Sequence, residues 1–353
     1  MRLVPSALIA TTILSASMSM AQADLKVVAS IKPIHSLVAG VMEGTGTPTL
    51  IVEGTGSPHT YALKPSQARR LQEADLVFWV GNILEPFLQK PLESIASKAT
   101  TVTLINVDGL NQITFREGGA FDAHGHDDHK GHDDHDDHDD QKGYDDHDDH
   151  DDHKGYDDHD DHDDHKGHDD HDDHDDHAHG AYDPHIWLDP INAKVLVHDI
   201  EEALVASDPA NAAIYKANAD RIMANLDALV AEIDATLDPV KSQGFIVFHD
   251  AYQHFEQRFG MSAVGSMTVS PEVLPGAERV RELQEKVRRS NASCVFSEPQ
   301  FEPKLVATIT ENTDAGTGVL DPLGASLKNG PDLYFNLIRG MAASLKGCLG
   351  GTS

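Results

Sequence analysis

Short apolar runs alternate with amphipathic stretches along most of the chain. Mostly apolar runs bounded by turn residues lie at 26–31, 48–52, 76–81, 101–106, 244–249, 261–269, 294–298 and 318–320. In the first half, stretches with helical spacing separate these runs at 33–43, 66–74 and 86–98. Continuously apolar strands that alternate with helices are typical of parallel sheets covered on both faces. The pattern therefore predicts an α/β fold with parallel sheets.

One amphipathic stretch is much longer than the others. It begins at Asp208, which suits an N-cap, and Pro209, which suits a first helical turn. Its apolar positions recur at helical spacing as far as Pro239: Tyr215, Ile222, Leu226, Leu229, Ile233 and Leu237. A helix of about 30 residues is ~45 Å long, more than one small domain needs. We interpret 208–238 as a rigid connector between an N-terminal α/β lobe (24–207) and a C-terminal α/β lobe (239–353). One large sheet with a long surface helix is the alternative.

A run of histidine and aspartate interrupts the first half. Residues 124–179 hold 17 His and 26 Asp, mostly as Asp-Asp-His triplets, and no Val, Ile, Leu or Phe. Without apolar side chains the run cannot offset the entropy of ordering its backbone, so we expect a disordered loop. Imidazole and carboxylate groups suit borderline divalent metals, with zinc the commonest candidate. A solvating acidic spacer is the alternative, but solubility does not explain a His in every triplet.

The charge of the chain belongs mostly to this run. The formal net charge is −32, and the 26 Asp and four Lys of the run contribute −22 of it. The remainder is a mildly acidic globular protein. Neither part has the basic surface that nucleic-acid binding requires, so we expect no nucleic-acid partner.

The first 23 residues have the features of a secretory signal peptide. Arg2 precedes an apolar stretch, and Ala21-Gln22-Ala23 fits a cleavage site. No other run approaches the ~20 apolar residues of a membrane span, so we do not expect a membrane-embedded protein. In an exported chain we expect the two cysteines, Cys294 and Cys348, to form a disulfide worth ~4 kcal/mol in the chain-entropy model. Two buried free thiols are the alternative.

Four polar side chains follow predicted strands, where open α/β sheets bind ligands. His59 follows the second strand, His185 lies in a loop that enters a helix, His249 ends the strand 244–249, and Asp321 follows the last strand. Three imidazoles with a carboxylate or water make a tetrahedral zinc site. Spacing alone does not bring these positions together.

The stretches around these residues resemble one family. They are 57–66 (SPHTYALKPS), 183–190 (DPHIWLDP), 248–252 (FHDAY) and 320–324 (LDPLG). They are similar to the ZnuA family, the periplasmic zinc-binding components of bacterial ABC importers. The resemblance covers essentially the whole mature chain, including a His/Asp-rich insertion. It implies two α/β lobes joined by a long helix, with the metal in the cleft between them.

The resemblance also implies His59, His185 and His249 as metal ligands. Related manganese-binding proteins have a glutamate in place of His249, and a nitrogen-rich site favours zinc. Asp321 matches the carboxylate that completes the manganese sites, but zinc members can use water or another carboxylate instead. The family's cysteine pair matches Cys294 and Cys348.

The other candidate residues have smaller predicted roles. We expect His35 to cap a helix or support the site, with direct metal contact as the alternative. We expect His198 at the surface and His254 on a helix that leads away from the cleft. Glu298 is expected either to orient a ligand imidazole through its second ring nitrogen or to be structural. Trp187 and Trp79 are expected in the core.

Together these observations predict a monomeric binding protein in the periplasm of a Gram-negative bacterium. It would capture Zn²⁺ and deliver it to the permease of a zinc ABC transporter and, through it, to the ATPase. We expect no enzyme, since a zinc hydrolase needs a general base and the sequence has no HExxH motif. The His/Asp run is expected beside the cleft as an accessory for zinc capture or sensing. A periplasmic zinc store or a metal-dependent adhesin is the alternative.

Overall fold

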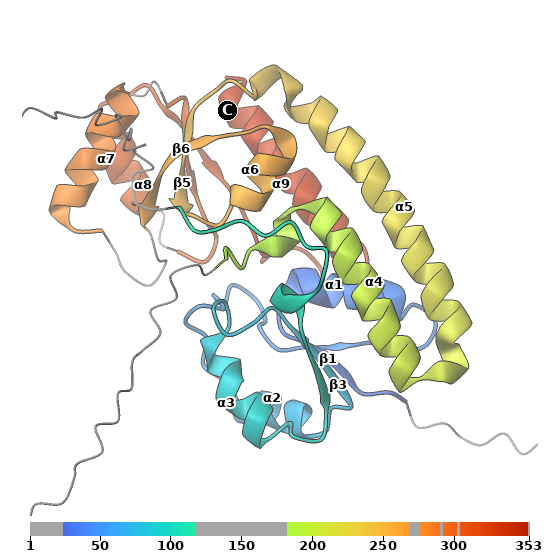
Figure 1. Ribbon diagram of the computed structural model, residues 1–353. Coiled ribbons are helices and arrows are strands. Elements are labelled where there is room, and N and C mark those ends of the chain that lie inside the picture. Colours follow the sequence, from blue (N-terminus) through green and yellow to red (C-terminus); the bar gives the residue numbers. More distant parts are fainter. Residues whose placement is uncertain (1–23, 117–181, 269–274, 290–291, 302–303, 352–353) are drawn as a thin grey trace, which may run out of the picture. The chain divides into compact units, whose positions relative to one another are not determined.

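Two parallel sheets form the framework of the protein (Figure 1). The computed structural model describes residues 24–116, 182–268, 275–289, 292–301 and 304–351. The expected signal peptide and the His/Asp run lie outside these residues. Each sheet has four strands, and every pairing within it is parallel. The predicted fold class is therefore confirmed, and the alternative of one large sheet is wrong.

The first sheet has the strand order β2-β1-β3-β4. Its elements in chain order are β1 (Val27–Ala29), α1 (Lys32–Val41), β2 (Thr49–Leu50), α2 (Pro65–Gln72), β3 (Leu76–Trp79), α3 (Pro86–Ser94) and β4 (Thr100–Thr103). All the strands and helices predicted for this half are present. The predicted strand 101–106 is shorter than expected, because a 3₁₀ turn replaces it at Leu104–Asn106.

The second sheet has the order β6-β5-β7-β8. Its elements are β5 (Phe245–His249), α6 (Gln253–Phe259), β6 (Ala263–Thr268), α7 (Ala277–Arg289), β7 (Cys294–Ser297), α8 (Lys304–Thr310), β8 (Gly316–Val319) and α9 (Leu333–Leu349). All five residues of β5 are buried, as a strand covered on both faces requires. The strand ends at His249.

Two long helices connect the sheets. A 3₁₀ turn (Ile186–Leu188) leads into α4 (Pro190–Ser207), and α5 (Ala212–Leu237) follows between two further 3₁₀ turns (Pro209–Asn211 and Asp238–Val240). All six apolar positions predicted to form the helix face are buried. Figure 1 shows α5 alongside α4, and α5 also packs against α1 of the first half and α9 of the second. These contacts place the long helix against both halves.

Asp208 occupies the predicted N-cap position, before the 3₁₀ turn that leads into α5. The first turn after it is 3₁₀, and its side chain makes no capping bond to the backbone. Its carboxylate instead accepts hydrogen bonds from Asn211 Nδ2 at 2.6 Å and Tyr215 Oη at 2.8 Å. The residue that does cap a long helix is Asp189, whose Oδ1 accepts from the Ile191 amide at the start of α4.

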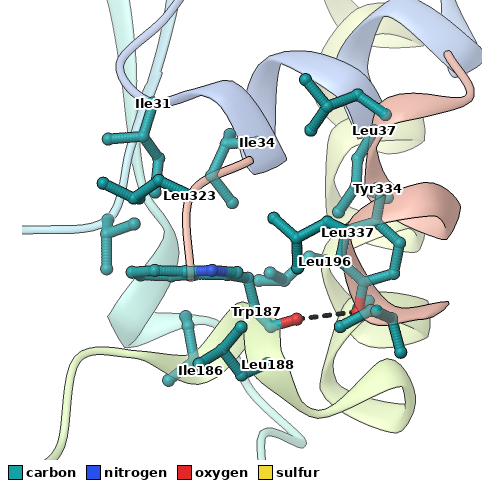
Figure 2. Close-up of a cluster of buried hydrophobic side chains, with 14 of the residues drawn as sticks. Ile31, Ile34, Leu37, Ile186, Trp187, Leu188, Leu196, Leu323, Tyr334 and Leu337 are labelled. Carbon is teal, nitrogen blue, oxygen red and sulfur yellow. Dashed lines mark hydrogen bonds between the residues drawn. The ribbon is translucent and has the colours of Figure 1, made fainter. Parts of the chain in front are cut away.

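Trp187 joins the two halves in one core, as Figure 2 shows. The side chain is fully buried, as predicted. Apolar residues from both halves surround it, among them Ile31, Ile34, Leu196, Leu323 and Leu337. Its Nε1 donates to the Pro322 carbonyl at 2.8 Å, and its own carbonyl accepts from Tyr334 Oη at 2.7 Å. The loop that carries Trp187 is therefore fixed to the C-terminal half by packing and by two buried hydrogen bonds.

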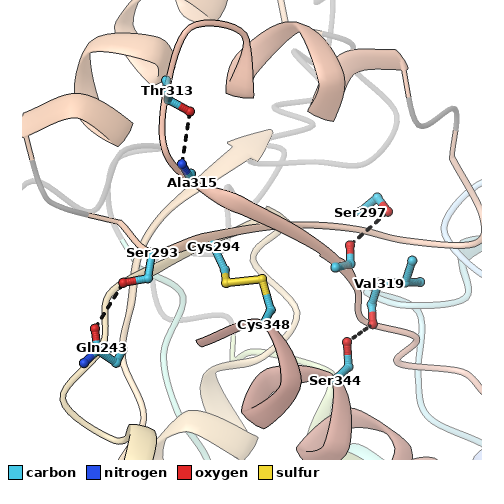
Figure 3. The surroundings of a disulfide bond; sticks show 10 residues. Gln243, Ser293, Cys294, Ser297, Thr313, Ala315, Val319, Ser344 and Cys348 are labelled. Atoms are coloured by element: carbon cyan, nitrogen blue, oxygen red, sulfur yellow. Dashed lines mark hydrogen bonds between the residues drawn. A yellow bond between two sulfur atoms is a disulfide. The ribbon is translucent and has the colours of Figure 1, made fainter. Parts of the chain in front are cut away.

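Cys294 and Cys348 form the predicted disulfide (Figure 3), so the alternative of two free thiols is wrong. The bond joins the first residue of β7 to α9, 54 positions apart. It ties the C-terminal helix to the second sheet. Among the helices of the described residues, none has the length and apolar character needed to cross a membrane.

Candidate metal centre

Three histidines from separate segments meet in the folded chain. His59 lies in the loop between β2 and α2, His185 directly before the 3₁₀ turn at 186–188, and His249 at the end of β5. One ring nitrogen from each lies within 4.8 Å of the other two, and the ring centroids are 5.3–5.7 Å apart. Among the described residues this is the one group of His, Cys, Asp and Glu with metal-binding geometry. The predicted convergence of these three positions is present in the structure.

Buried carboxylates orient two of the three imidazoles. His185 Nδ1 lies 2.6 Å from Asp183 Oδ1, and His249 Nδ1 lies 2.6 Å from Glu298 Oε1. A carboxylate accepts from Nδ1–H and so leaves the lone pair on Nε2, which is the arrangement found in metal-binding histidines. His249 Nε2 is buried and has no hydrogen-bond partner in the described part of the chain. Both rings therefore present Nε2 to a metal ion.

The pKa values of the three imidazoles differ. Burial and the two neighbouring imidazoles lower the pKa of His59 to about 2. Burial and the same kind of repulsion lower the pKa of His185 well below its ordinary value. Burial also acts to lower the pKa of His249, but the negative charge of Glu298, Asp250 and Asp183 outweighs it and raises that pKa. Two of the imidazoles are thus neutral and ready to bind a cation, and His249 is the ring at which protons compete most strongly with a metal ion.

The cavity at the imidazoles is small, with a volume of about 10 Å³. Its other lining residues are Ser57, Pro58, Trp187, Glu298, Gln300, Phe301, Pro322 and Leu323. This volume is about the minimum that one water molecule needs, so the site suits a single ion with at most one water molecule beside it. The mostly apolar wall excludes bulk water and strengthens the attraction between a cation and the carboxylates behind the rings.

Asp321 is not brought into this group. Its Oδ1 accepts from the amides of Leu323 and Gly324 at 3.1 and 2.9 Å, and its Oδ2 accepts from the Ala325 amide at 2.6 Å. The carboxylate thus binds the turn that follows it. The prediction that Asp321 follows the last strand is correct. The direction of its side chain could not be predicted from the sequence.

One of the remaining histidines follows its prediction, and another does not. His198 is exposed on α4, as expected. His35 is buried outside the group, where its Nε2 donates to the Pro48 carbonyl at 3.0 Å. Its side chain does not cap α1, and it does not belong to the three-histidine group of the described residues.

His254 differs from its prediction. Its helix does not lead away from the site, since the side chain is fully buried. Its Nε2 lies 3.1 Å from the Asp183 carbonyl, so it supports the loop that carries His185. His254 is buried because α6 packs on the turn 186–188. The spacing of residues along a helix does not predict such a contact.

Glu298 orients His249, as one of its two predicted roles required. The equivalent partner of His185, Asp183, was not predicted. The sequence feature that could have indicated this role is its position two residues before His185, with Pro184 between them. Arg116 was also missed, and it pairs with Asp250 at 3.5 Å and with Glu256 at 2.6 Å. Asp250 directly follows His249, so this cluster lies behind the site.

The fold and the site define an α/β metal-binding protein of the solute-binding class. The family model for "Zinc-uptake complex component A periplasmic" matches residues 27–348, and the chain belongs to this family. The high-affinity zinc uptake system protein ZnuA of Brucella abortus is 52% identical over 323 residues, which are 92% of this chain and 91% of that protein. The Yersinia pestis protein of the same name is 32% identical, over 93% of this chain and 92% of its own length.

Solved structures show the same fold. A ZnuA deletion mutant crystallised with zinc has a TM-score of 0.67 and 21% identity, and the match covers 92% of this chain and 98% of that one. The predicted resemblance to the ZnuA family is confirmed. The protein is a zinc-binding component of a zinc uptake system, and zinc is the ion that it carries.

Proposed function

We propose that the chain binds one Zn²⁺ ion through His59, His185 and His249 and delivers it to the permease of a zinc ABC transporter. The convergence of three imidazoles from three separate segments carries this proposal. The hydrogen bonds that Asp183 and Glu298 make with Nδ1 of His185 and His249 also support it. They leave Nε2 of both rings free to bind a metal, an arrangement that histidines with a purely structural role do not require.

Family membership supports the rest of the transport proposal. Removal of residues 1–23 would release a mature chain that begins at Asp24 in the periplasm of a Gram-negative bacterium. There it acts as a monomer, and its partners are the permease and, through it, the ATPase that drives import. It has no role in nucleic-acid binding.

We further propose that the protein is not an enzyme. A zinc hydrolase needs room for a substrate beside the metal and a base that is free to take a proton. The cavity of about 10 Å³ accommodates an ion and no organic substrate. The carboxylates beside the rings, Asp183 and Glu298, each bind an imidazole Nδ1 through one oxygen, which holds them in place behind the rings.

Residues 24–207 and 239–353 are proposed to act as two lobes, with 208–238 as the connector. The contacts of α5 with both α1 and α9 support a stiff connection. The His/Asp run 124–179 is proposed to be an accessory that captures zinc or senses its excess. In this proposal the transported ion is bound by the three single histidines and not by the His/Asp run.

Deletion of residues 125–178 followed by zinc titration tests the proposal. The bridge between Thr114 and Tyr182 already brings the two flanking segments together, so a short linker can replace the deleted residues. We expect one tight site to survive the deletion and to be lost in His249→Ala. Loss of all tight binding with the run would instead favour a periplasmic zinc store, and an unchanged dissociation constant in His249→Ala would refute the ligand assignment.

The accessory role of the run has its own test. Uptake of zinc under severe zinc limitation is compared in cells with the intact and the run-deleted protein. We expect slower uptake without the run. Equal rates would remove the delivery role and leave sensing. A metal-dependent adhesin, the other alternative, would lose surface attachment and keep zinc uptake when the three histidines are replaced.

A further inference from the structure

Three imidazoles leave one position of a tetrahedral zinc ion without a protein ligand. Asp321, the carboxylate expected there from the sequence, is bound to three backbone amides of its own turn at 2.6–3.1 Å. Withdrawing it from these amides would leave three partly buried N–H groups unpaired, at a cost in free energy. The fourth position therefore has to be filled in another way.

Gln300 connects Asp321 to the cavity. Its Nε2 lies 3.4 Å from Asp321 Oδ1, and the residue lines the same cavity as the three imidazoles. The NH₂ group of the amide donates and the carboxylate oxygen accepts, so the amide turns its NH₂ group toward Asp321. The carbonyl oxygen, Oε1, then points away from Asp321. It is buried and has no hydrogen-bond partner among the described residues.

A buried amide oxygen without a partner has a cost, and a donor in the cavity would remove that cost. The imidazole nitrogens that face a zinc ion have no proton to offer, so the donor must come from elsewhere. A water molecule bound to the ion is such a donor. The cavity volume of about 10 Å³ is too small for a larger ligand.

We propose that Gln300 accepts a hydrogen bond from a water molecule that fills the fourth coordination position of zinc. This inference rests on the proposed function, since it assumes zinc at the three histidines. Gln300 is a positioning residue, and Asp321 acts through it by fixing the orientation of the amide. The result is a donor set of three nitrogens and one neutral oxygen, which favours zinc over manganese because manganese prefers carboxylates.

Two substitutions at position 300 have opposite consequences. Gln300→Ala removes the acceptor, and we expect zinc to bind about tenfold more weakly with one ion still bound at the site. Gln300→Glu places a carboxylate at this position. Because Asp321 repels the new negative charge, we expect the side chain to turn toward the cavity. We expect it to coordinate the ion and to raise the affinity for manganese relative to zinc about tenfold or more. A loss of packing alone would not change metal preference in this direction.

The measurement uses the full chain at less than one zinc per protein, so that only the tightest site is populated. Zinc affinity is measured against a chelator, and manganese displacement is measured on the same samples. Gln284→Ala is the matched control, because this glutamine on α7 donates to the Thr308 carbonyl and lies outside the cavity. It should behave as the wild type in both assays.

Different results would overturn the role of Gln300 and the proposed function. Wild-type zinc affinity in Gln300→Ala together with wild-type metal preference in Gln300→Glu would overturn the role of Gln300. Unchanged tight zinc binding in His185→Ala would overturn the proposed function on which that role rests.

Discussion

His185 and His249 are held differently from His59. The first two each donate Nδ1–H to a buried carboxylate, whereas no such bond is present for His59 in the described residues. The three candidate ligands were predictable because each lies within a family motif, in a loop or at the end of a strand. Their carboxylate partners, Asp183 and Glu298, were less predictable. Their role depends on the direction in which each side chain points in the folded protein, and the sequence does not show this direction. Gln300 was not predicted at all, since its role depends on its distance from Asp321.

Replacing Glu298 with Gln should weaken zinc binding about tenfold. The neutral amide leaves His249 in place but no longer makes its Nε2 more basic, and loss of such partners typically reduces metal affinity 10–100-fold. Competition with a chelator at a pH of about 8 measures the effect. Glu282→Gln, an exposed acid on α7, is the control and should bind zinc as the wild type does. Equal affinities in the two variants would contradict the orienting role of Glu298.

Zinc affinity should fall with falling pH through the release of one proton. His59, with its pKa lowered to about 2, and His185, with its pKa also lowered, stay neutral in the physiological range. The raised pKa of His249 means that this ring gains a proton first and then competes with zinc. Below that pKa we expect the logarithm of the association constant to fall by about one per pH unit. A slope near three would contradict this account, and Glu298→Gln should move the fall to lower pH.

Arg116 and the helix α6 support the site from behind. Arg116 pairs with Asp250 and Glu256, and Asp183 lies in the same region, so one guanidinium faces several buried acids. Burial raises the pKa of Asp250 to about 7, with Glu256 and Asp183 adding to the rise and Arg116 opposing it. Burial also raises the pKa of Asp183 to about 6, against the positive charge of Arg116. The sequence predicted a helix at His254, where α6 lies. The side on which it packs depends on contacts with 183–189, which spacing cannot contain.

Arg116→Ala should lower the free energy of unfolding of the metal-free protein by about 2 kcal/mol or more near neutral pH. Breaking a buried ion pair leaves its partners charged and unpaired. Because carboxylates with raised pKa values are protonated in the folded state at low pH, the loss should be smaller at a pH of about 5 than at about 8. Chemical denaturation at both values tests this. Arg289→Ala, which breaks the exposed pair with Glu285, should change stability by less than ~0.5 kcal/mol.

The chain as a whole holds the two sheets in one hydrogen-bonded core. Lys32 Nζ donates to the carbonyls of Ala325 and Leu327 at 3.0 and 2.8 Å, and Ser36 Oγ donates to the Gly330 carbonyl at 2.8 Å. With the bonds of Trp187, these contacts fix the loop of His185 against the half that carries His249. The two-sheet fold was predictable from the alternating pattern. The contacts between the halves were not, because they use backbone carbonyls that the sequence does not distinguish.

The central claim is that three single histidines, and not the His/Asp run, hold the transported ion. Anomalous diffraction at the zinc absorption edge, from crystals grown with one equivalent of zinc, tests it most directly. We predict one strong peak at a distance of about 2.0–2.1 Å from a ring nitrogen of each of His59, His185 and His249. A strong zinc peak elsewhere in the chain, with none at these three rings, would contradict the account.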